Sequence, residues 1–159
     1  MTQDTVNDPT QPGPDRSGGP DGPVLVVDDS ASVRAYHSSI LADAGFTVQE
    51  AGNGYEALER VVVQRFALLV VDVNMPVMDG YTLVGAVRTR TLGADVPIIM
   101  ISTEQEAVDS AEAYRRGANV YLVKPAEPEQ LRLTALLLTG RTAGHAGAAG
   151  AAGAAGGRS

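Results

Sequence analysis

Hydrophobic and polar positions alternate along the middle of the chain in a regular succession of short and long segments. Short runs rich in β-branched residues predict strands at residues 24–28, 46–50, 67–72, 97–101 and 119–123. Longer segments with apolar residues at helical spacing predict helices at roughly 30–44, 54–65, 80–89, 104–116 and 128–139. This alternation of strands and helices predicts an α/β fold.

The ends of the predicted helices carry residues that favour those positions. Residues typical of N-caps precede the first four helices, namely Ser30, Asn53, Asp79 and, for the fourth helix, Ser102 or Thr103. Gly45 and Gly117 lie one residue beyond the first and fourth helices, where a glycine commonly ends a helix.

Units of this size predict a doubly wound, five-stranded parallel sheet with helices on both faces and the flavodoxin-like strand order 2-1-3-4-5. The first, third and fourth strands are almost wholly apolar, as strands buried on both faces are. The second strand, FTVQE, alternates and suits an edge. In such sheets, ligands bind beyond the carboxyl ends of the strands.

Composition narrows the function classes. The chain has 159 residues and no cysteine, so we expect one domain without disulfides or thiolate metal sites. A net charge of -7 argues against binding nucleic acid through its phosphates. The chain has no signal peptide and no apolar run near the roughly 20 residues that cross a bilayer. We therefore expect no membrane insertion and a cytoplasmic location.

The two ends of the chain differ from its middle. Residues 1–23 are rich in Pro, Gly, Asp and Thr, and we expect a disordered leader. Residues 140–159 form an Ala/Gly low-complexity segment, and we expect a disordered tail. The folded domain should then occupy residues 24–139, with no output module at either end.

Polar residues stand where the predicted strands end. Asp28 and Asp29 end the first strand, Asp72 the third, Ser102 follows the fourth and Lys124 the fifth. Each has an ordinary alternative, because such residues also cap helices, form turns or lie solvated at the surface. Their conjunction at the one edge where this fold places its ligands favours a functional site.

Three carboxylates close together repel one another unless a cation neutralises them. A ligand set made only of oxygen selects a hard divalent ion, and Mg²⁺ suits a few carboxylates together with water and a phosphate. A carboxylate held in this way can attack a phosphoryl group, while an ammonium and the metal neutralise the transferring oxygens. The pattern therefore predicts a phosphoryl acceptor site.

Four segments resemble, in order and spacing, the receiver domain of two-component response regulators: DDSASVR (28–34), VVDVNMPVMDG (70–80), PIIMISTE (97–104) and VYLVKP (120–125). The resemblance covers residues 24 to about 139. Within the family it is closest to single-domain, CheY-like chemotaxis regulators, partly because no output domain follows. Ala126 stands where Phe is common and Val73 where the chemotaxis proteins have Trp, and neither departure touches the acceptor chemistry.

The resemblance implies a role for each matching residue. Asp72 would be the phosphoacceptor, phosphorylated by a histidine kinase. Asp29, Asp72 and the backbone carbonyl of Asn74 would bind Mg²⁺ directly, and Asp28 mainly through water. Lys124 would pair with the phosphoryl group, and the peptide bond that follows it would be cis.

The resemblance also implies a switch. Ser102 would be the hydroxyl drawn toward the phosphoryl group, and Tyr121 the aromatic residue that rotates inward. Asn74 and Glu104 occupy the positions that modulate self-dephosphorylation, and both match the chemotaxis type. We therefore expect a signalling switch rather than an enzyme, in which the surface of the fourth helix, fifth strand and fifth helix binds a target such as the flagellar motor switch protein.

Other functions remain as alternatives. The protein could be a phosphate sink or a phosphorelay intermediate instead of a motor effector. A Mg²⁺-dependent phosphatase with an aspartyl nucleophile needs Asp-x-Asp on the first strand, which DDSAS does not supply. An FMN carrier needs a Ser/Thr/Gly-rich phosphate loop where this chain has two carboxylates.

Two further features have ordinary interpretations. His37 and His145 have no second histidine or cysteine nearby, so we expect surface positions rather than metal binding or phosphotransfer. Glu112 and Arg116 are spaced four apart on a helix and should form an exposed ion pair.

Overall fold

The computed structural model describes residues 22–105 and 107–142. In this part of the chain the strands are β1 (Val24–Val27), β2 (Val48–Ala51), β3 (Leu68–Asp72), β4 (Ile98–Ser102) and β5 (Val120–Val123). The helices are α1 (Ala31–Asp43), α2 (Gly54–Val63), α3 (Gly80–Arg88), α4 (Ala107–Arg116) and α5 (Pro128–Thr139). Most of the predicted leader and tail, residues 1–21 and 143–159, lies outside the described residues.

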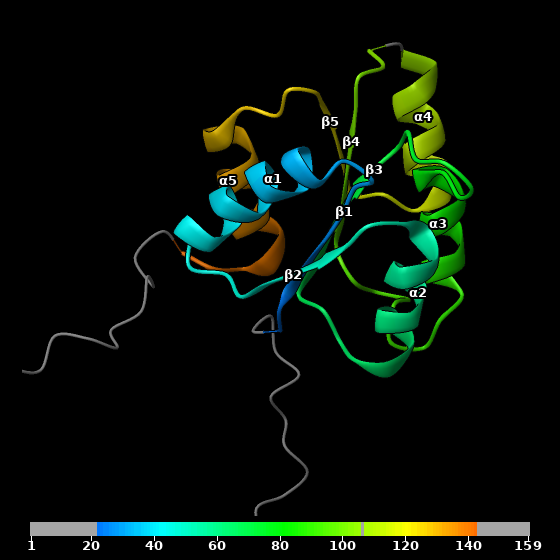
Figure 1. The fold of residues 1–159 in the computed structure, drawn as a ribbon, viewed down its shortest axis with the longest axis horizontal. Coiled ribbons are helices and arrows are strands. Elements are labelled where there is room, and N and C mark those ends of the chain that lie inside the picture. The colour runs from blue at the N-terminus through cyan, green and yellow to red at the C-terminus, as the bar shows by residue number, and fades with distance from the viewer. Residues whose placement is uncertain (1–21, 106, 143–159) are drawn as a thin grey trace, which may run out of the picture.

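All strand pairs are parallel, and the sheet has the order β2-β1-β3-β4-β5, which confirms the predicted fold. Helices α1 and α5 cover one face of the sheet, and α2, α3 and α4 cover the other (Figure 1). Among the strands of the described sheet, only β2, at one edge, lacks a run of consecutive apolar residues. Its sequence, VQEA, includes two polar residues because part of the strand faces solvent.

Each face of the sheet has its own hydrophobic core, because alternate residues of a strand point to opposite sides. On the face covered by α2, α3 and α4, the central strands contribute Leu25, Val27, Leu69 and Val71. On the other face they contribute Val24, Val26, Leu68 and Val70. All of these side chains are at most 1% exposed, which explains why the central strands are continuously apolar.

Three of the predicted N-caps are confirmed. The side chains of Ser30, Asn53 and Asp79 accept hydrogen bonds from backbone N–H groups in the first turns of α1, α2 and α3. The predicted helix ends are also confirmed, since Gly45 and Gly117 follow α1 and α4 with φ of 91° and 109°. These left-handed conformations are ones that glycine adopts without strain.

The prediction that Ser102 or Thr103 caps the fourth helix is wrong. β4 extends through Ser102, which pairs with Val123 and whose carbonyl accepts a hydrogen bond from the Lys124 N–H at 2.7 Å. Because this residue is engaged in the sheet, a connection follows it and α4 begins only at Ala107. The sequence pattern placed the start of the helix about one turn too early.

The predicted surface position of His37 is also wrong, because its side chain is only 3% exposed. His37 lies on the face of α1 that buries Ile40 and Leu41, three and four residues later. The helix has few large apolar residues, and the histidine ring fills a core position that its sequence pattern does not mark. His145 lies outside the described residues.

Both ends of the described domain lie at the amino edge of the sheet. The Pro23 carbonyl accepts a hydrogen bond from Ala67, just before β3 begins. At the other end, Arg141 donates to the carbonyl of Gly45 at 3.2 Å and stacks 4.7 Å from the Phe46 ring centroid. The carboxyl ends of the strands are therefore at the opposite edge from both chain ends.

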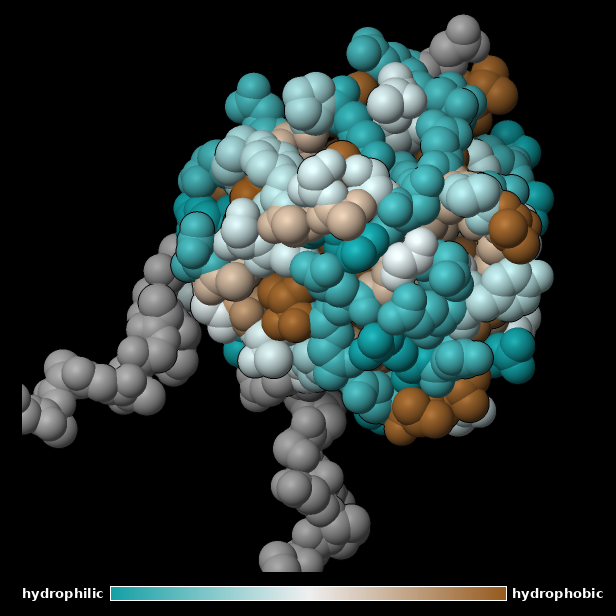
Figure 2. Space-filling view, viewed as in Figure 1, coloured by the Kyte–Doolittle hydropathy of each residue, from teal (hydrophilic) through white to brown (hydrophobic). Residues whose placement is uncertain are grey.

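The visible surface is mostly hydrophilic, with small separate apolar patches (Figure 2). Exposed apolar side chains come from several elements, for example Val63 of α2 at 77% and Leu137 of α5 at 81% exposed. Within the described residues, no helix combines the length and apolar character that crossing a bilayer requires.

Candidate functional site

The register of the sheet brings three predicted aspartates together. Val27 of β1 pairs with Val71 of β3, so Asp28 and Asp72, the next residues along, are neighbours at the carboxyl edge. Asp28, Asp29 and Asp72 form a cluster of the described chain in which one ligand oxygen from each lies within 4.8 Å of the others. Asp28 and Asp72 are buried, and Asp29 is exposed.

Lys124 enters this cluster from the end of β5. Its Nζ lies 2.8 Å from Oδ1 of Asp72 and 3.1 Å from Oδ2 of Asp28. The Lys124–Pro125 peptide bond is cis, as predicted. One ammonium group thus holds two buried carboxylates at the edge where the fold places its ligands.

The environment of Asp72 disfavours its charge. Burial raises the pKa of the Asp72 carboxyl, the negative charge of Asp28 adds to this, and the contact with Lys124 opposes it without cancelling it. Oδ1 of Asp72 is buried without an aligned hydrogen-bond donor, so its 2.8 Å contact with Lys124 is an ion pair by distance only. This oxygen retains capacity for another electropositive partner.

Lys124 has the opposite balance. Burial lowers the pKa of its ammonium, but the close contact with the charged Asp72, followed by the hydrogen bond and charge of Asp28, outweighs burial and raises the pKa. Lys124 therefore carries a positive charge at neutral pH. Together, the clustered carboxylates and this single ammonium have a formal charge of −2.

The cluster fits a hard divalent cation. Its ligands are carboxylate oxygens, its formal charge matches that of such an ion, and the buried Oδ1 of Asp72 lacks an aligned donor. Mg²⁺ prefers this kind of oxygen ligand set. Asn74, whose backbone carbonyl completes the predicted set, follows Asp72 by two residues and is exposed at the rim of the site.

Asp28 is fixed by residues of α1. The Ser30 backbone N–H donates to Oδ1 of Asp28 at 2.9 Å, and Nη1 of Arg34 donates to the Asp28 carbonyl at 2.7 Å. Arg34 also pairs with Glu50 of β2 at 3.0 Å. Sequence reasoning missed this support, although Arg34 lies within the segment DDSASVR and one turn after the helix N-cap.

The predicted switch residues are linked by hydrogen bonds through Glu104. Ser102 is fully buried at the end of β4, and its Oγ accepts from the Glu104 N–H at 3.1 Å. The hydroxyl of Tyr121, on β5, donates to the Glu104 carbonyl at 3.0 Å. Beside them, the Asn74 side chain donates to Oγ1 of Thr103 at 3.4 Å. Asn74 and Glu104 are both exposed near the site.

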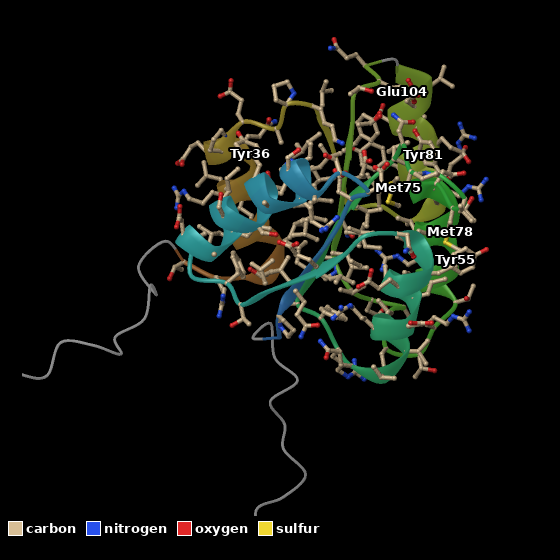
Figure 3. All side chains as sticks on the ribbon, viewed as in Figure 1. Tyr36, Tyr55, Met75, Met78, Tyr81 and Glu104 are labelled. Atoms are coloured by element: carbon tan, nitrogen blue, oxygen red, sulfur yellow. The ribbon has the colours of Figure 1, made fainter. Side chains whose placement is uncertain are left out.

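The loop between β3 and α3 packs closely beneath Asp72. A Cβ at Gly80 would collide with the carbonyl oxygen of Asp72, so glycine is needed for this approach. The Met78 side chain fills the space that Gly54 leaves at the start of α2, near Tyr55 (Figure 3). Val77, in contrast, is 89% exposed and has a φ of 70°, an unfavourable conformation for a β-branched residue.

A mostly apolar pocket of about 350 Å³ opens beside the site, between the start of α1 and the β5–α5 connection. Lys124 and the buried His37 line it. Burial lowers the pKa of His37, with Asp28 raising it and Lys124 lowering it further. The sequence pattern did not indicate that this histidine lies within electrostatic range of the carboxylates.

The chain combines a flavodoxin-like parallel sheet with clustered aspartates and a paired lysine at the carboxyl edge of that sheet. The chain belongs to the response regulator receiver domain family, whose model matches residues 24–136. This is a domain family of two-component signalling.

Comparisons with individual proteins agree with this assignment. The chemotaxis protein CheY4 of Vibrio cholerae is 42% identical, with a TM-score of 0.69 over 74% of this chain and 98% of that one. The receiver domain of the sensor histidine kinase PA1611 of Pseudomonas aeruginosa, which has a magnesium ion coordinated in its active site cleft, is 26% identical with a TM-score of 0.70, covering 75% and 98%.

Among curated relatives, the transcriptional regulatory protein SrrA of Staphylococcus aureus is 32% identical over 119 residues, which are 75% of this chain and 48% of that protein. The chain spans less than half the length of the curated relatives it matches.

Proposed function

We propose that Asp72 accepts a phosphoryl group from a histidine kinase, and that this phosphorylation changes the affinity of the domain for a target protein. The observation that carries the proposal is the buried Asp72 carboxylate beside Asp28 and Lys124, with one oxygen that lacks an aligned donor. Such an oxygen is available both to a cation and to an incoming phosphoryl group.

The transfer joins an Asp72 carboxylate oxygen to phosphorus as the P–N bond to the donor imidazole breaks, and that nitrogen keeps the electron pair. Burial makes the Asp72 carboxylate more basic, and therefore a better nucleophile once it is ionised. Lys124, which stays charged, lies where it can pair with the oxygens of the transferred group.

The residues that would hold Mg²⁺ are Asp28, Asp29, Asp72 and the backbone carbonyl of Asn74. When bound, the ion supplies positive charge that offsets the charge on the phosphoryl oxygens. Asn74 and Glu104, exposed near the acceptor, are suited to control the access of water to the phosphorylated residue and hence the lifetime of the signal.

The proposed response begins at Ser102. A phosphoryl group on Asp72 attracts this hydroxyl, which must then release the Glu104 N–H that it now accepts. Tyr121 donates to the same residue, so its rotation inward would follow from the change at Glu104. The target would bind the surface formed by α4, β5 and α5. The phosphoryl group biases this equilibrium only through contacts that differ between the two states.

The main experiment is labelling with acetyl phosphate and Mg²⁺, read by intact mass. We expect an acid-stable, base-labile adduct of one phosphate, no adduct on Asp72→Asn, and full labelling of Asp43→Asn, an exposed carboxylate at the end of α1. Equal labelling of Asp72→Asn would refute the assignment. Multiple turnover of small phosphate esters would instead support the alternative of a phosphatase.

For the output, we propose a chemotaxis target such as the flagellar motor switch protein, supported by the similarity to CheY4. A phosphate sink or phosphorelay intermediate is the alternative. A pull-down with and without beryllofluoride, a phosphoryl mimic, distinguishes them. Capture of the switch protein only with the mimic supports the motor role, and capture of kinases alone supports the sink or relay.

We further propose that the functional unit is the domain at residues 24–139, between a leader and a tail, that it works in the cytoplasm, and that it neither binds nucleic acid nor inserts into a membrane. Gly140 and Arg141, which begin the proposed tail, cap α5 and contact the domain. Limited proteolysis of the full chain, with the fragments identified by mass, tests the two boundaries.

A further inference from the structure

We propose that Tyr81 is a further positioning residue of this switch: its hydroxyl holds the first turn of α4 while that of Tyr121 holds the connection before the helix. This inference rests on the function proposed above. It assigns to α3 a direct part in controlling α4.

The two tyrosines bind backbone carbonyls on either side of the start of α4. Tyr121 donates to the Glu104 carbonyl at 3.0 Å, three residues before the helix begins at Ala107. Tyr81, near the start of α3, donates to the Asp109 carbonyl at 3.2 Å, in the first turn of α4. The entry into α4 is therefore held from two different elements.

The rings of both tyrosines pack against the same hydrophobic core. Burial raises the pKa of the Tyr81 hydroxyl well above its usual value, and the neighbouring Tyr121, Asp109 and Glu104 raise it further. Tyr81 therefore stays a protonated donor at every pH at which the protein would work. Figure 3 shows Tyr81 and Glu104 on the side of the molecule that carries α4.

This pair is connected to the acceptor edge through one residue. The Glu104 N–H donates to Oγ of Ser102, and the Glu104 carbonyl accepts from the Tyr121 hydroxyl. If Ser102 and Tyr121 both leave Glu104, the connection loses these two bonds, whereas the bond from Tyr81 to Asp109 still ties α4 to α3. That bond therefore limits how far the change at Ser102 can move the helix.

The sign of the effect follows from this geometry. The hydrogen bond of Tyr81 is formed in the present arrangement, so its loss favours the arrangement in which α4 is released. A net hydrogen bond of ordinary strength corresponds to a shift in the equilibrium of about fivefold. Tyr81→Phe removes the hydroxyl and keeps the ring in the core.

The experiment measures the affinity of the full chain for beryllofluoride in the presence of Mg²⁺, by calorimetry, together with hydrogen exchange over α4. We expect Tyr81→Phe to bind beryllofluoride about fivefold more tightly than the wild type, with faster exchange in the first turn of α4. The matched control is Tyr55→Phe, which makes the same change at an exposed tyrosine of α2, away from α4 and from Lys124. It should change neither measurement.

A loss of thermal stability in Tyr81→Phe without a change in affinity would show a merely structural role and overturn the inference. An equal gain in affinity in Tyr55→Phe would overturn it as well. Failure of the proposed function has a different result: the wild type itself would neither bind beryllofluoride nor label on Asp72. If the wild type labels on Asp72 but Tyr81→Phe binds beryllofluoride with unchanged affinity, only the inference about Tyr81 is contradicted.

Discussion

The ammonium of Lys124 lies 2.8 Å from Oδ1 of Asp72, in a contact that joins the last residue of β3 to the residue that follows β5. The same Nζ reaches Asp28 after β1, so a single side chain ties the carboxyl ends of three strands together. These ion pairs hold the carboxyl ends of the three strands together, and their contribution to the stability of the fold can be measured.

Replacing Lys124 with methionine should strongly destabilise the fold in the absence of metal. Among the described residues, Lys124 supplies the ammonium that pairs with these two buried carboxylates, and breaking a buried ion pair typically costs about 3 kcal/mol. Urea denaturation with a chelator present measures the loss. Arg132→Met, which removes an exposed pair with Glu129, should cost far less, because solvent screens such pairs. Equal losses in the two variants would contradict this account.

Asp72→Asn should stabilise the metal-free protein at neutral pH. The folded-state pKa of Asp72 is raised from 3.8, so between 3.8 and that higher value the folded protein binds more protons than the unfolded chain. Stability from this group is therefore fully present below pH 3.8 and is lost as pH rises through the folded pKa.

Asparagine does not ionise, so Asp72→Asn does not lose this stability as the pH rises. Urea midpoints measured from acidic to neutral pH should show a gap in its favour at neutral pH that narrows on acidification. A gap of constant size, or a wild type more stable than the variant throughout, would show that burial does not control the titration of Asp72. Asp43→Asn, exposed on α1, should follow the wild type across the range.

Asp29→Asn should separate metal binding from folding. Asp29 is exposed while its two cluster partners are buried, so its loss should hardly change the stability of the metal-free protein. Mg²⁺ at about ten times its dissociation constant should stabilise the wild type by about 1.4 kcal/mol, and the variant should lose most of this gain. Thermal denaturation across a Mg²⁺ titration measures both quantities. A variant that responds like the wild type would remove Asp29 from the ligand set.

Val77→Asn should stabilise the protein by about 1 kcal/mol, because asparagine tolerates the left-handed region much better than a β-branched residue does. With 89% of Val77 exposed, little buried apolar area is lost. The matched control is Val63→Asn, in which an exposed valine at the end of α2 is replaced without relief of such a conformation. If Val77→Asn stabilises the protein no more than Val63→Asn does, φ at residue 77 carries no measurable strain.

Much of the fold follows from short-range pattern. The apolar runs of β1, β3 and β4 and the caps Ser30, Asn53 and Asp79 depend on residues near in sequence, and the structure confirms them. The pair of Glu112 and Arg116, predicted from helical spacing, is present at 2.7 Å. The start of α4 was misplaced because pairing of Ser102 with β5 competes with helix capping, and local pattern does not register that competition.

The candidate site residues could be predicted from the sequence because each one ends or follows its own strand, and a parallel sheet places these strand ends at one edge. The residues that support them could not be predicted in this way. Arg34 binds the carbonyl of Asp28, and Tyr81 binds that of Asp109, 28 residues away. Backbone carbonyls are present at every position, so no residue type in the sequence marks them as partners. Buried His37 was missed for a related reason, since a polar residue in the core interrupts the apolar pattern that identifies a buried face.

The positions of Pro23 and Arg141 have a practical consequence. Both anchor the chain at the edge of the sheet away from Asp72. A fusion partner, an affinity tag or a linker to a sensor chip joined next to Pro23 or Arg141 would be attached at the edge of the sheet opposite the carboxylates. Protein tethered at either of these positions should therefore keep Asp72 open to a partner in solution.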